Sequence, residues 1–160
     1  MRLYFLRHAD ALDNANDAIR PLSPKGERQS RAVGGFLRDA GIAFDAAFSS
    51  PLVRARETAE IVLGLTGAVK PARLRAVDAL LNGTSAREFE GWLRALQEVD
   101  HVLLVGHAPS LSERARVLLS IEDPGALDLP KCGLACVESE DGRQGALKFL
   151  VTPKQLGRRP

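Results

Sequence analysis

Short apolar runs of strand length alternate with amphipathic segments along the chain. Residues 2–6 form an apolar run, and residues 101–105 form a continuous β-rich run that is typical of a strand covered on both faces. Residues 44–48 form a third strand candidate. The segment 74–81 is ambiguous between a strand fragment and a loop.

Capping signals and the helical spacing of apolar residues predict helices between these strands. The predicted helices begin at Ser23-Pro24, Ser50-Pro51, Ser85 and Pro109-Ser110. In the first two pairs serine is a good N-cap, and proline in the first turn wastes no hydrogen bond. The first helix is expected to end at Gly41 and the second near Gly64 or Gly67.

A hairpin signal lies late in the chain, where an Asp-Gly turn separates residues 134–138 from 146–151. Strands that alternate with helices predict an α/β fold. We expect a three-layer sandwich in which helices flank a mainly parallel central sheet, completed by the antiparallel hairpin. The length predicts one domain over residues 1–160, with a frayed tail over about 155–160.

Composition and charge exclude several classes of protein. The chain has 22 basic and 20 acidic residues, a net charge of +2, and no basic patch with interleaved aromatics, so no nucleic-acid partner is expected. No apolar run approaches the ~20 residues that span a bilayer. Charge interrupts the N-terminus too early for a secretion signal, so we expect a cytoplasmic protein. Cys132 and Cys136 offer neither a disulfide scaffold nor enough zinc ligands and are expected to be reduced thiols.

Two of the three histidines follow strand candidates at their carboxyl ends. His8 follows the first run and His107 follows the run at 101–105, whereas His101 begins a strand and is expected at the opposite edge. In open α/β sheets the ligand crevice lies beyond the carboxyl ends of the strands. His8 and His107 are therefore candidate site residues, although a histidine after a strand is also common on an ordinary surface.

Three arginines lie where they could meet these histidines. Arg54 is expected in the opening turn of a helix, where unpaired N–H groups and the positive end of the helix dipole attract anions. Arg7 precedes His8, and Arg20 lies in the loop before the first helix. Because 17 of the 22 basic residues are arginine, spacing alone favours a solvated surface role for Arg54, and the positions of Arg7 and Arg20 are weak evidence by themselves.

Three motifs resemble the histidine phosphatase superfamily, with its phosphoglycerate mutase-like fold. They are Leu6-Arg7-His8-Ala9, Ser49-Ser50-Pro51-Leu52-Val53-Arg54-Ala55-Arg56-Glu57-Thr58-Ala59 and Val105-Gly106-His107-Ala108-Pro109-Ser110. Likeness to the small phosphohistidine phosphatase branch, the SixA type, rests on the short length together with Arg20-Pro21-Leu22-Ser23 and Lys25-Gly26. The usual Arg-His-Gly of the superfamily is Arg-His-Ala here.

The resemblance implies a metal-independent phosphohistidine phosphatase that uses no cofactor. It assigns His8 as the nucleophile that becomes phosphorylated. It assigns Arg7, Arg54 and His107 to the pocket around the phosphoryl oxygens, with Arg20 as a further member. Nearby cations favour the neutral imidazole that attack on phosphorus needs. The expected partner is a phosphohistidine-bearing protein such as a phosphorelay domain.

An alkoxide leaving group would need a general acid, and no mid-chain glutamate matches this role convincingly. Asp10, two residues from His8, and Asp78 are the candidates, while Glu88 and Glu90 fit a solvated helix face. Imidazole leaves a phosphoramidate more readily than an alkoxide leaves an ester, so the missing acid favours phosphohistidine. The alternatives are a small-ester phosphatase with Asp10 or Asp78 as acid, a phosphate-binding module without turnover, and a metal site on the two histidines.

Overall fold

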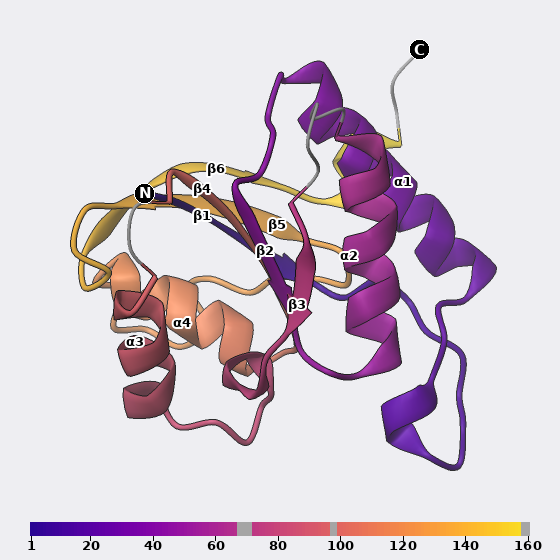
Figure 1. Cartoon of the computed structure of the whole chain (residues 1–160), viewed down its shortest axis with the longest axis horizontal. Helices are drawn as coiled ribbons and strands as arrows, with labels where there is room; N and C mark the ends of the chain where they lie inside the picture. Colours follow the sequence, from indigo (N-terminus) through magenta and orange to yellow (C-terminus); the bar gives the residue numbers. More distant parts are fainter. Residues whose placement is uncertain (67–71, 97–98, 158–160) are drawn as a thin grey trace.

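One six-stranded sheet forms the centre of the protein, in a computed structural model that describes residues 1–66, 72–96 and 99–157 (Figure 1). Its strands are β1 (Arg2–Arg7), β2 (Ala46–Ser49), β3 (Leu74–Ala76), β4 (His101–Gly106), β5 (Leu134–Ser139) and β6 (Gly145–Val151). They lie in the order β3-β2-β4-β1-β5-β6. The pairs β1–β4, β2–β4 and β2–β3 are parallel, whereas β5 pairs antiparallel with both β1 and β6. The predicted α/β fold with a mainly parallel sheet is confirmed.

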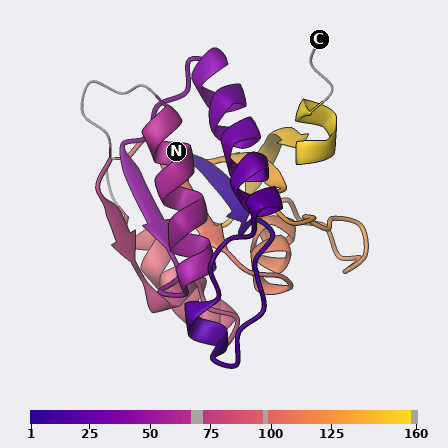
Figure 2. The same ribbon diagram turned by 90° about the vertical axis from the view of Figure 1, so that its right-hand side faces the viewer.

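Helices cover both faces of the sheet. They are α1 (Pro24–Asp39), α2 (Val53–Leu65), α3 (Ala86–Arg94), α4 (Ser110–Leu118) and α5 (Pro153–Leu156), with the short 3₁₀ helices η1 (Asp17–Ile19) and η2 (Asp78–Leu80). α1 and α2 lie side by side over one face, as Figure 2 shows, and α3 and α4 cover the other. No helix in the described part of the chain has the length and apolarity to cross a membrane.

Two serine–proline pairs that look alike in the sequence have different structures. Ser23 caps α1 as predicted, because its hydroxyl oxygen accepts a hydrogen bond from the Gly26 N–H. Ser50 does not cap α2, and the prediction there is wrong: Leu52 occupies the N-cap position and makes no capping bond with its side chain. The physical reason is a tertiary contact, since the Ser50 hydroxyl is bonded to the His107 ring instead.

The ambiguous segment and the expected helix ends are now defined. Residues 74–81 divide into the short strand β3 and the 3₁₀ helix η2. Gly41, with a φ of 70°, follows the end of α1 as predicted. α2 ends at Leu65, so Gly64 lies within its last turn, and Gly67 lies outside the described residues.

The C-terminal segment contains the predicted hairpin but continues further as ordered structure. The Asp141-Gly142 turn joins β5 to β6, and Gly142 has a φ of 72°, which glycine adopts without strain. The prediction of a frayed tail from about residue 155 is wrong for Gln155 and Leu156. Both belong to α5, and Leu156 packs against the core near α1. Residues 158–160 lie outside the described part.

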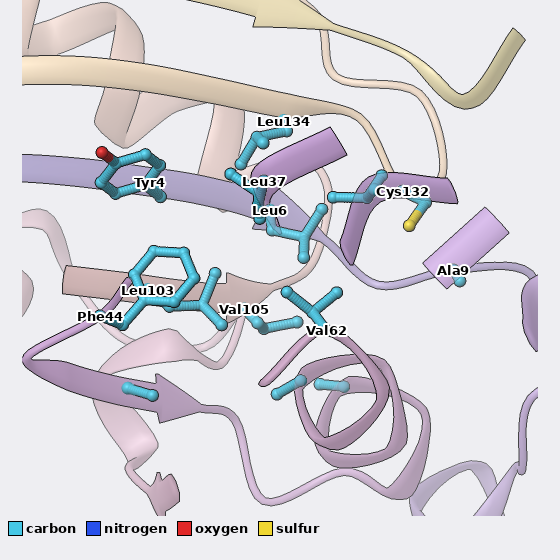
Figure 3. Close-up of a cluster of buried hydrophobic side chains, with 14 of the residues drawn as sticks. Tyr4, Leu6, Ala9, Leu37, Phe44, Val62, Leu103, Val105, Cys132 and Leu134 are labelled. Atoms are coloured by element: carbon cyan, nitrogen blue, oxygen red, sulfur yellow. The ribbon is translucent and has the colours of Figure 1, made fainter. Parts of the chain in front are cut away.

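β1 is buried on both faces, which explains its continuous apolar run. Tyr4 and Leu6 belong to the core beneath α1 and α2, while Leu3 and Phe5 belong to a second core beneath α3 and α4. Figure 3 shows Tyr4 and Leu6 in the first core with Val62 of α2. This alternation is the two-residue period of a strand, and each large apolar side chain buried in this way stabilises the fold by ~1.5–3 kcal/mol.

Both cysteines are free and buried near the antiparallel strands. Burial raises the pKa of the Cys132 thiol to about 12 and also raises the pKa of Cys136. Buried, protonated thiols of this kind are inert.

Parallel pairing of β1 with β4 brings the carboxyl ends of the two strands together. Arg7 lies in register with Gly106, and the His8 N–H donates to the Gly106 carbonyl oxygen at 3.0 Å. His8 and His107 therefore leave the sheet at the same edge. His101 begins β4 at the opposite edge, as predicted.

The close approach of α1 to the segment after His8 leads to a stability prediction. A Cβ atom on Gly26 would lie 1.9 Å from the Asp10 carbonyl oxygen, whereas Gly64 of α2 has open space around the same position. Gly26→Ala is expected to lower the free energy of unfolding by ~1–3 kcal/mol, as overpacking does. The matched control Gly64→Ala should be neutral or stabilising by up to ~1 kcal/mol. Urea denaturation measures both, and equal stabilities would contradict the prediction.

Candidate active site

His8 and His107 lie side by side at the carboxyl edge of the sheet. Their ring centroids are 5.1 Å apart, the ring planes are inclined by 49°, and both side chains are buried. The structure thus brings together the two histidines that follow β1 and β4 in the sequence. Arg7 ends β1 and Arg54 lies in the first turn of α2, which packs beside β4.

The His8 ring is held in one tautomer by the backbone. Its Nδ1 lies 2.7 Å from the Ala9 carbonyl oxygen. A carbonyl only accepts hydrogen bonds, so Nδ1 carries the hydrogen and Nε2 carries the lone pair. His8 Nε2 has no hydrogen-bond partner among the residues that the structure describes. The nitrogen that could act as a nucleophile is therefore free.

The environment of His8 keeps its ring neutral. Burial is the main cause and, together with the positive charges of Arg54, Arg7 and Lys131, it lowers the pKa of His8 to about 4. The bond to the Ala9 carbonyl opposes this shift but does not outweigh it. A neutral imidazole at physiological pH is the form that can donate an electron pair.

Two guanidinium groups near His8 each leave Nε unpaired within the described residues. Arg54 donates from Nη1 to the Asp17 carbonyl oxygen at 2.9 Å and from Nη2 to the Asp17 carboxylate at 3.2 Å. Arg7 donates from Nη1 to the Leu129 carbonyl oxygen at 3.0 Å. The Nε atoms of both arginines are buried and have no hydrogen-bond partner in the described part of the chain.

Ser50 sets the tautomer of His107. The Ser50 Oγ lies 2.6 Å from His107 Nε2 and also accepts a hydrogen bond from the Leu52 N–H at 3.3 Å. Because Ser50 is buried and this ring nitrogen is its available acceptor, its hydroxyl donates to Nε2, and the hydrogen of the neutral ring resides on Nδ1. Burial, the charge of His8 and the charge of Arg54 lower the pKa of His107 to about 3.

Three buried nitrogen donors around His8 therefore lack an acceptor within the described residues: Arg7 Nε, Arg54 Nε and His107 Nδ1. Each unsatisfied buried donor costs ~1–3 kcal/mol, so the cluster is suited to a ligand rich in acceptors. A phosphoryl group offers such oxygens together with negative charge. Residues 1–66, 72–96 and 99–157 contain no group of three or more His, Cys, Asp or Glu side chains that could hold a metal ion.

Residues 3–80 match the family model of the histidine phosphatase superfamily (branch 1). The chain belongs to the histidine phosphatase superfamily. It is 34% identical to an uncharacterized protein of Picosynechococcus sp., over 98% of this chain and 99% of that protein. It is 26% identical to the phosphohistidine phosphatase SixA of Escherichia coli, over 98% and 96% of the two chains. The structure of the protein histidine phosphatase SixA complexed with tungstate has a TM-score of 0.87 at 26% identity, covering 98% and 99%.

The alanine that follows the nucleophile candidate fits this histidine phosphatase without strain. Ala9 is fully buried in the core, and its backbone does not adopt the positive φ that would favour glycine. Its N–H donates to the Thr58 hydroxyl at 3.0 Å, and that hydroxyl donates to the Arg54 carbonyl oxygen at 2.7 Å. With alanine in place of the usual glycine, the backbone beside His8 is still hydrogen-bonded to Thr58 of α2.

Arg20 does not join the cluster of unpaired donors. Its Nε donates to the Leu12 carbonyl oxygen at 3.0 Å, and its remaining nitrogens face Asp17 at 3.4 Å and Asp13 at 3.7 Å. Asp17 also holds Arg54. Arg20 thus contacts Asp17, and Asp17 in turn contacts Arg54. Its role in the structure is to position the carboxylate that supports Arg54.

Asp10 is fully engaged and is not placed as a proton donor. Its carboxylate accepts from the Lys131 ammonium at 2.8 Å and from the Ser23 hydroxyl at 2.6 Å. Both bonds lower the pKa of Asp10, and the bond from Lys131 has the larger effect. The carboxyl group is therefore ionised at neutral pH. The bond from Ser23 connects the segment after His8 to the start of α1.

A cleft of about 540 Å³ adjoins the pocket formed by His8, Arg7, Arg54 and His107. Asp78 lies in the wall of this cleft. The cleft shares Arg54 and His107 with the pocket. The rest of its lining comes from Asp17, Leu52, Asp78, Leu81, Asn82, Gly83, Thr84 and Glu88. Glu88, expected on a solvated helix face, is exposed but faces this cleft. The Asp78 carboxylate makes no hydrogen bond or ion pair with any described residue.

Sequence reasoning did not identify three residues that support the pocket. Ser50 was hidden because a serine before a proline is a typical capping signal. Asp17 lies in a stretch dense in Asp and Asn, which is typical of a loop, and only its contact with Arg54 distinguishes it. Lys131 lies 121 residues from its partner Asp10, and no local pattern marks it.

The ring protonation of the free histidine phosphatase can be predicted. His8 is expected to titrate near pH 4 and His107 near pH 3, so both rings stay neutral at pH 6. Nitrogen-15 NMR of the imidazoles measures this directly. Arg54→Ala should raise both pKa values because it removes a cation. Titration of both rings near the ordinary value of about 6.5 would contradict the prediction.

The same shifts predict how stability depends on pH. Both folded-state pKa values lie below the unfolded value, so the unfolded chain binds more protons once the pH falls below about 6.5. The contribution of the two rings is therefore fully present above that pH and is lost as the pH falls through about 4. Urea denaturation at several pH values would reveal this loss.

A further prediction concerns Ser50. Ser50→Ala removes the donor to His107 Nε2, so the Nδ1–H tautomer should lose population in nitrogen-15 NMR spectra. The Kd for inorganic phosphate should rise about 2- to 10-fold, the effect of one ordinary hydrogen bond. Ser30→Ala is the matched control, because it removes a buried serine hydroxyl that bonds to the Gly26 carbonyl of α1. An unchanged tautomer in Ser50→Ala would refute this role.

Proposed function

We propose that this histidine phosphatase is a metal-independent phosphohistidine phosphatase in which His8 accepts the phosphoryl group. The observation that carries the proposal is the set of three unpaired buried donors around a neutral imidazole whose Nε2 is free. Their guanidinium and imidazole N–H groups supply the charge stabilisation and positioning that phosphoryl transfer asks of a protein. The likeness of this chain to SixA, whose structure contains tungstate, a tetrahedral oxyanion like phosphate, supports the proposal.

The first step transfers the phosphoryl group to the protein. The lone pair of His8 Nε2 attacks phosphorus, the Nε2–P bond forms, and the bond from phosphorus to the substrate nitrogen breaks. The leaving imidazole keeps the bonding electron pair and takes a proton from solvent. Arg7, Arg54 and His107 hold the phosphoryl oxygens while the negative charge on them is redistributed.

The second step regenerates His8. A water oxygen attacks phosphorus, the Nε2–P bond breaks, and the electron pair returns to His8. Inorganic phosphate leaves, and the proton lost by the water passes to solvent. A covalent intermediate of this kind divides one difficult displacement into two easier ones.

The chemistry of the carboxylates favours a phosphohistidine over a phosphate ester. Asp10 is ionised and bonded on both oxygens, so it is a poor proton donor to an alkoxide. Imidazole departs with less help from an acid. The open cleft beside the pocket leaves room for a phosphohistidine presented by another protein, such as a phosphorelay domain.

A small-ester phosphatase is the second candidate, because Asp78 lies in the wall of the cleft without a protein partner. If Asp78 is the acid, Asp78→Asn abolishes turnover of small phosphate esters. Comparing kcat/KM for a phosphohistidine protein with that for small esters separates the two candidates. A clear preference for esters would overturn the main proposal.

The decisive experiment measures phosphate release from a phosphohistidine protein. His8→Ala is expected to abolish release and to abolish the acid-labile phosphate that rapid-quench sampling finds on the wild-type chain. His101→Ala is the matched control, since it removes a histidine at the opposite edge of the sheet. Arg54→Ala and His107→Ala should each lower the rate about 10²- to 10³-fold, as the loss of one preorganised donor does. Phosphate binding without acid-labile phosphate would instead indicate a binding module.

A further inference from the structure

The cleft beside the pocket is lined by acidic groups, none of which exchanges a proton or forms a bond in the proposed phosphoryl transfer. Asp17 from η1, Asp78 from η2 and Glu88 from α3 bring three carboxylates to its wall. Arg54 is the cationic side chain in the same lining, and Asp17 holds it through two hydrogen bonds. The pocket proposed to bind the phosphoryl group is thus positive. The adjoining acidic wall, formed by Asp17, Asp78 and Glu88, is negative.

Hydrogen bonds and nearby cations favour the ionised forms of Glu88 and Asp17. The backbone and hydroxyl of Ser85 donate to Glu88 at 2.9 and 3.0 Å, and they lower the pKa of that carboxyl group. Burial opposes ionisation of Asp17, but the charges of Arg54 and Arg20 outweigh it, and its pKa is also lowered. The negative character of the wall is therefore a fixed property of the fold.

A buried group at the same cleft is suited to bind a ligand. His107 is 4% exposed, lines the cleft, and holds its Nδ1 buried without a partner in the described residues. Because Asp78 and Glu88 line the same cleft as His107, a molecule with a phosphoryl oxygen at this nitrogen would bring its other atoms into a cleft that contains these carboxylates. The acidic wall therefore faces whatever the phosphorus is attached to.

We propose that the acidic wall selects a phosphohistidine flanked by lysine or arginine and rejects phosphorylated molecules that carry carboxylates. This inference rests on the proposed function and adds the charge of the substrate to it. Opposite charges across an interface steer encounter and fix register, whereas like charges facing one another are repelled. The Asp78 carboxylate makes no hydrogen bond or ion pair with the described residues, and the Glu88 carboxylate is bonded only to Ser85 on its own helix. Both side chains are exposed, so they can pair with such flanking cations at modest desolvation cost.

The test compares three phosphohistidine peptides that differ only in flanking residues: lysine and arginine, alanine and serine, or glutamate. Wild-type kcat/KM is expected to fall in that order, with the basic-to-acidic ratio shrinking at high salt as exposed charges are screened. The double variant Asp78→Asn with Glu88→Gln should reduce the ratio about two- to fivefold for each carboxylate removed, as for exposed ion pairs. Glutamine at position 88 can keep the capping bond to Ser85.

The matched control is Glu90→Gln, which removes a carboxylate from the same helix but not from this cleft, and should leave the ratio unchanged. A wild-type ratio of one, a preference for acidic flanks, or a ratio unaffected by the double variant would overturn the inference. Binding of the same peptides built with a non-hydrolysable phosphohistidine analogue is measured alongside. Absence of hydrolysis overturns the proposed function, while the charge order in binding still decides the inference.

Discussion

The parallel pairing of β1 with β4 is the constraint on which the site depends. With Arg7 opposite Gly106, and the His8 N–H bonded to that glycine's carbonyl, the two histidines must emerge at one edge. The register is fixed by apolar packing on both faces of these strands, at a distance from the chemistry. A slip of one residue would turn the alternating side chains of β1 into the wrong cores, so the hydrophobic pattern also positions the histidines.

Burial at this edge has two linked effects. It removes water from His8 and His107, which favours their neutral forms, and it leaves donors of Arg7 and Arg54 without acceptors. Asp17 binds two nitrogens of Arg54 and so fixes the guanidinium while the third stays free. The unpaired donors are thus arranged to bind the oxygens of an oxyanion.

Sequence reasoning located the strand ends, and with them His8, His107 and the neighbouring arginines, because strand ends are encoded in local apolar patterns. It failed where tertiary contacts override a local signal. Ser23 and Ser50 precede prolines in the same way, yet only Ser23 caps its helix. The difference is that Ser50 is hydrogen-bonded to His107, which lies 57 residues later in the sequence. A local sequence pattern does not include residues that far apart. Loop position likewise does not specify which oxygen an arginine contacts, and Arg20 is bonded to Leu12 and Asp17.

The distribution of charge, rather than its total, explains how a nearly neutral chain can be selective. Phosphoryl oxygens are the same in every substrate of such a pocket, so Arg54 and His107 cannot distinguish one phosphorylated molecule from another. Discrimination must come from groups that face the atoms beyond phosphorus. In this chain the groups proposed for that role are the carboxylates of Asp78 and Glu88, which lie on elements separate from β1 and β4. Substitution of these exposed carboxylates would therefore leave intact the strand register that brings His8 and His107 together.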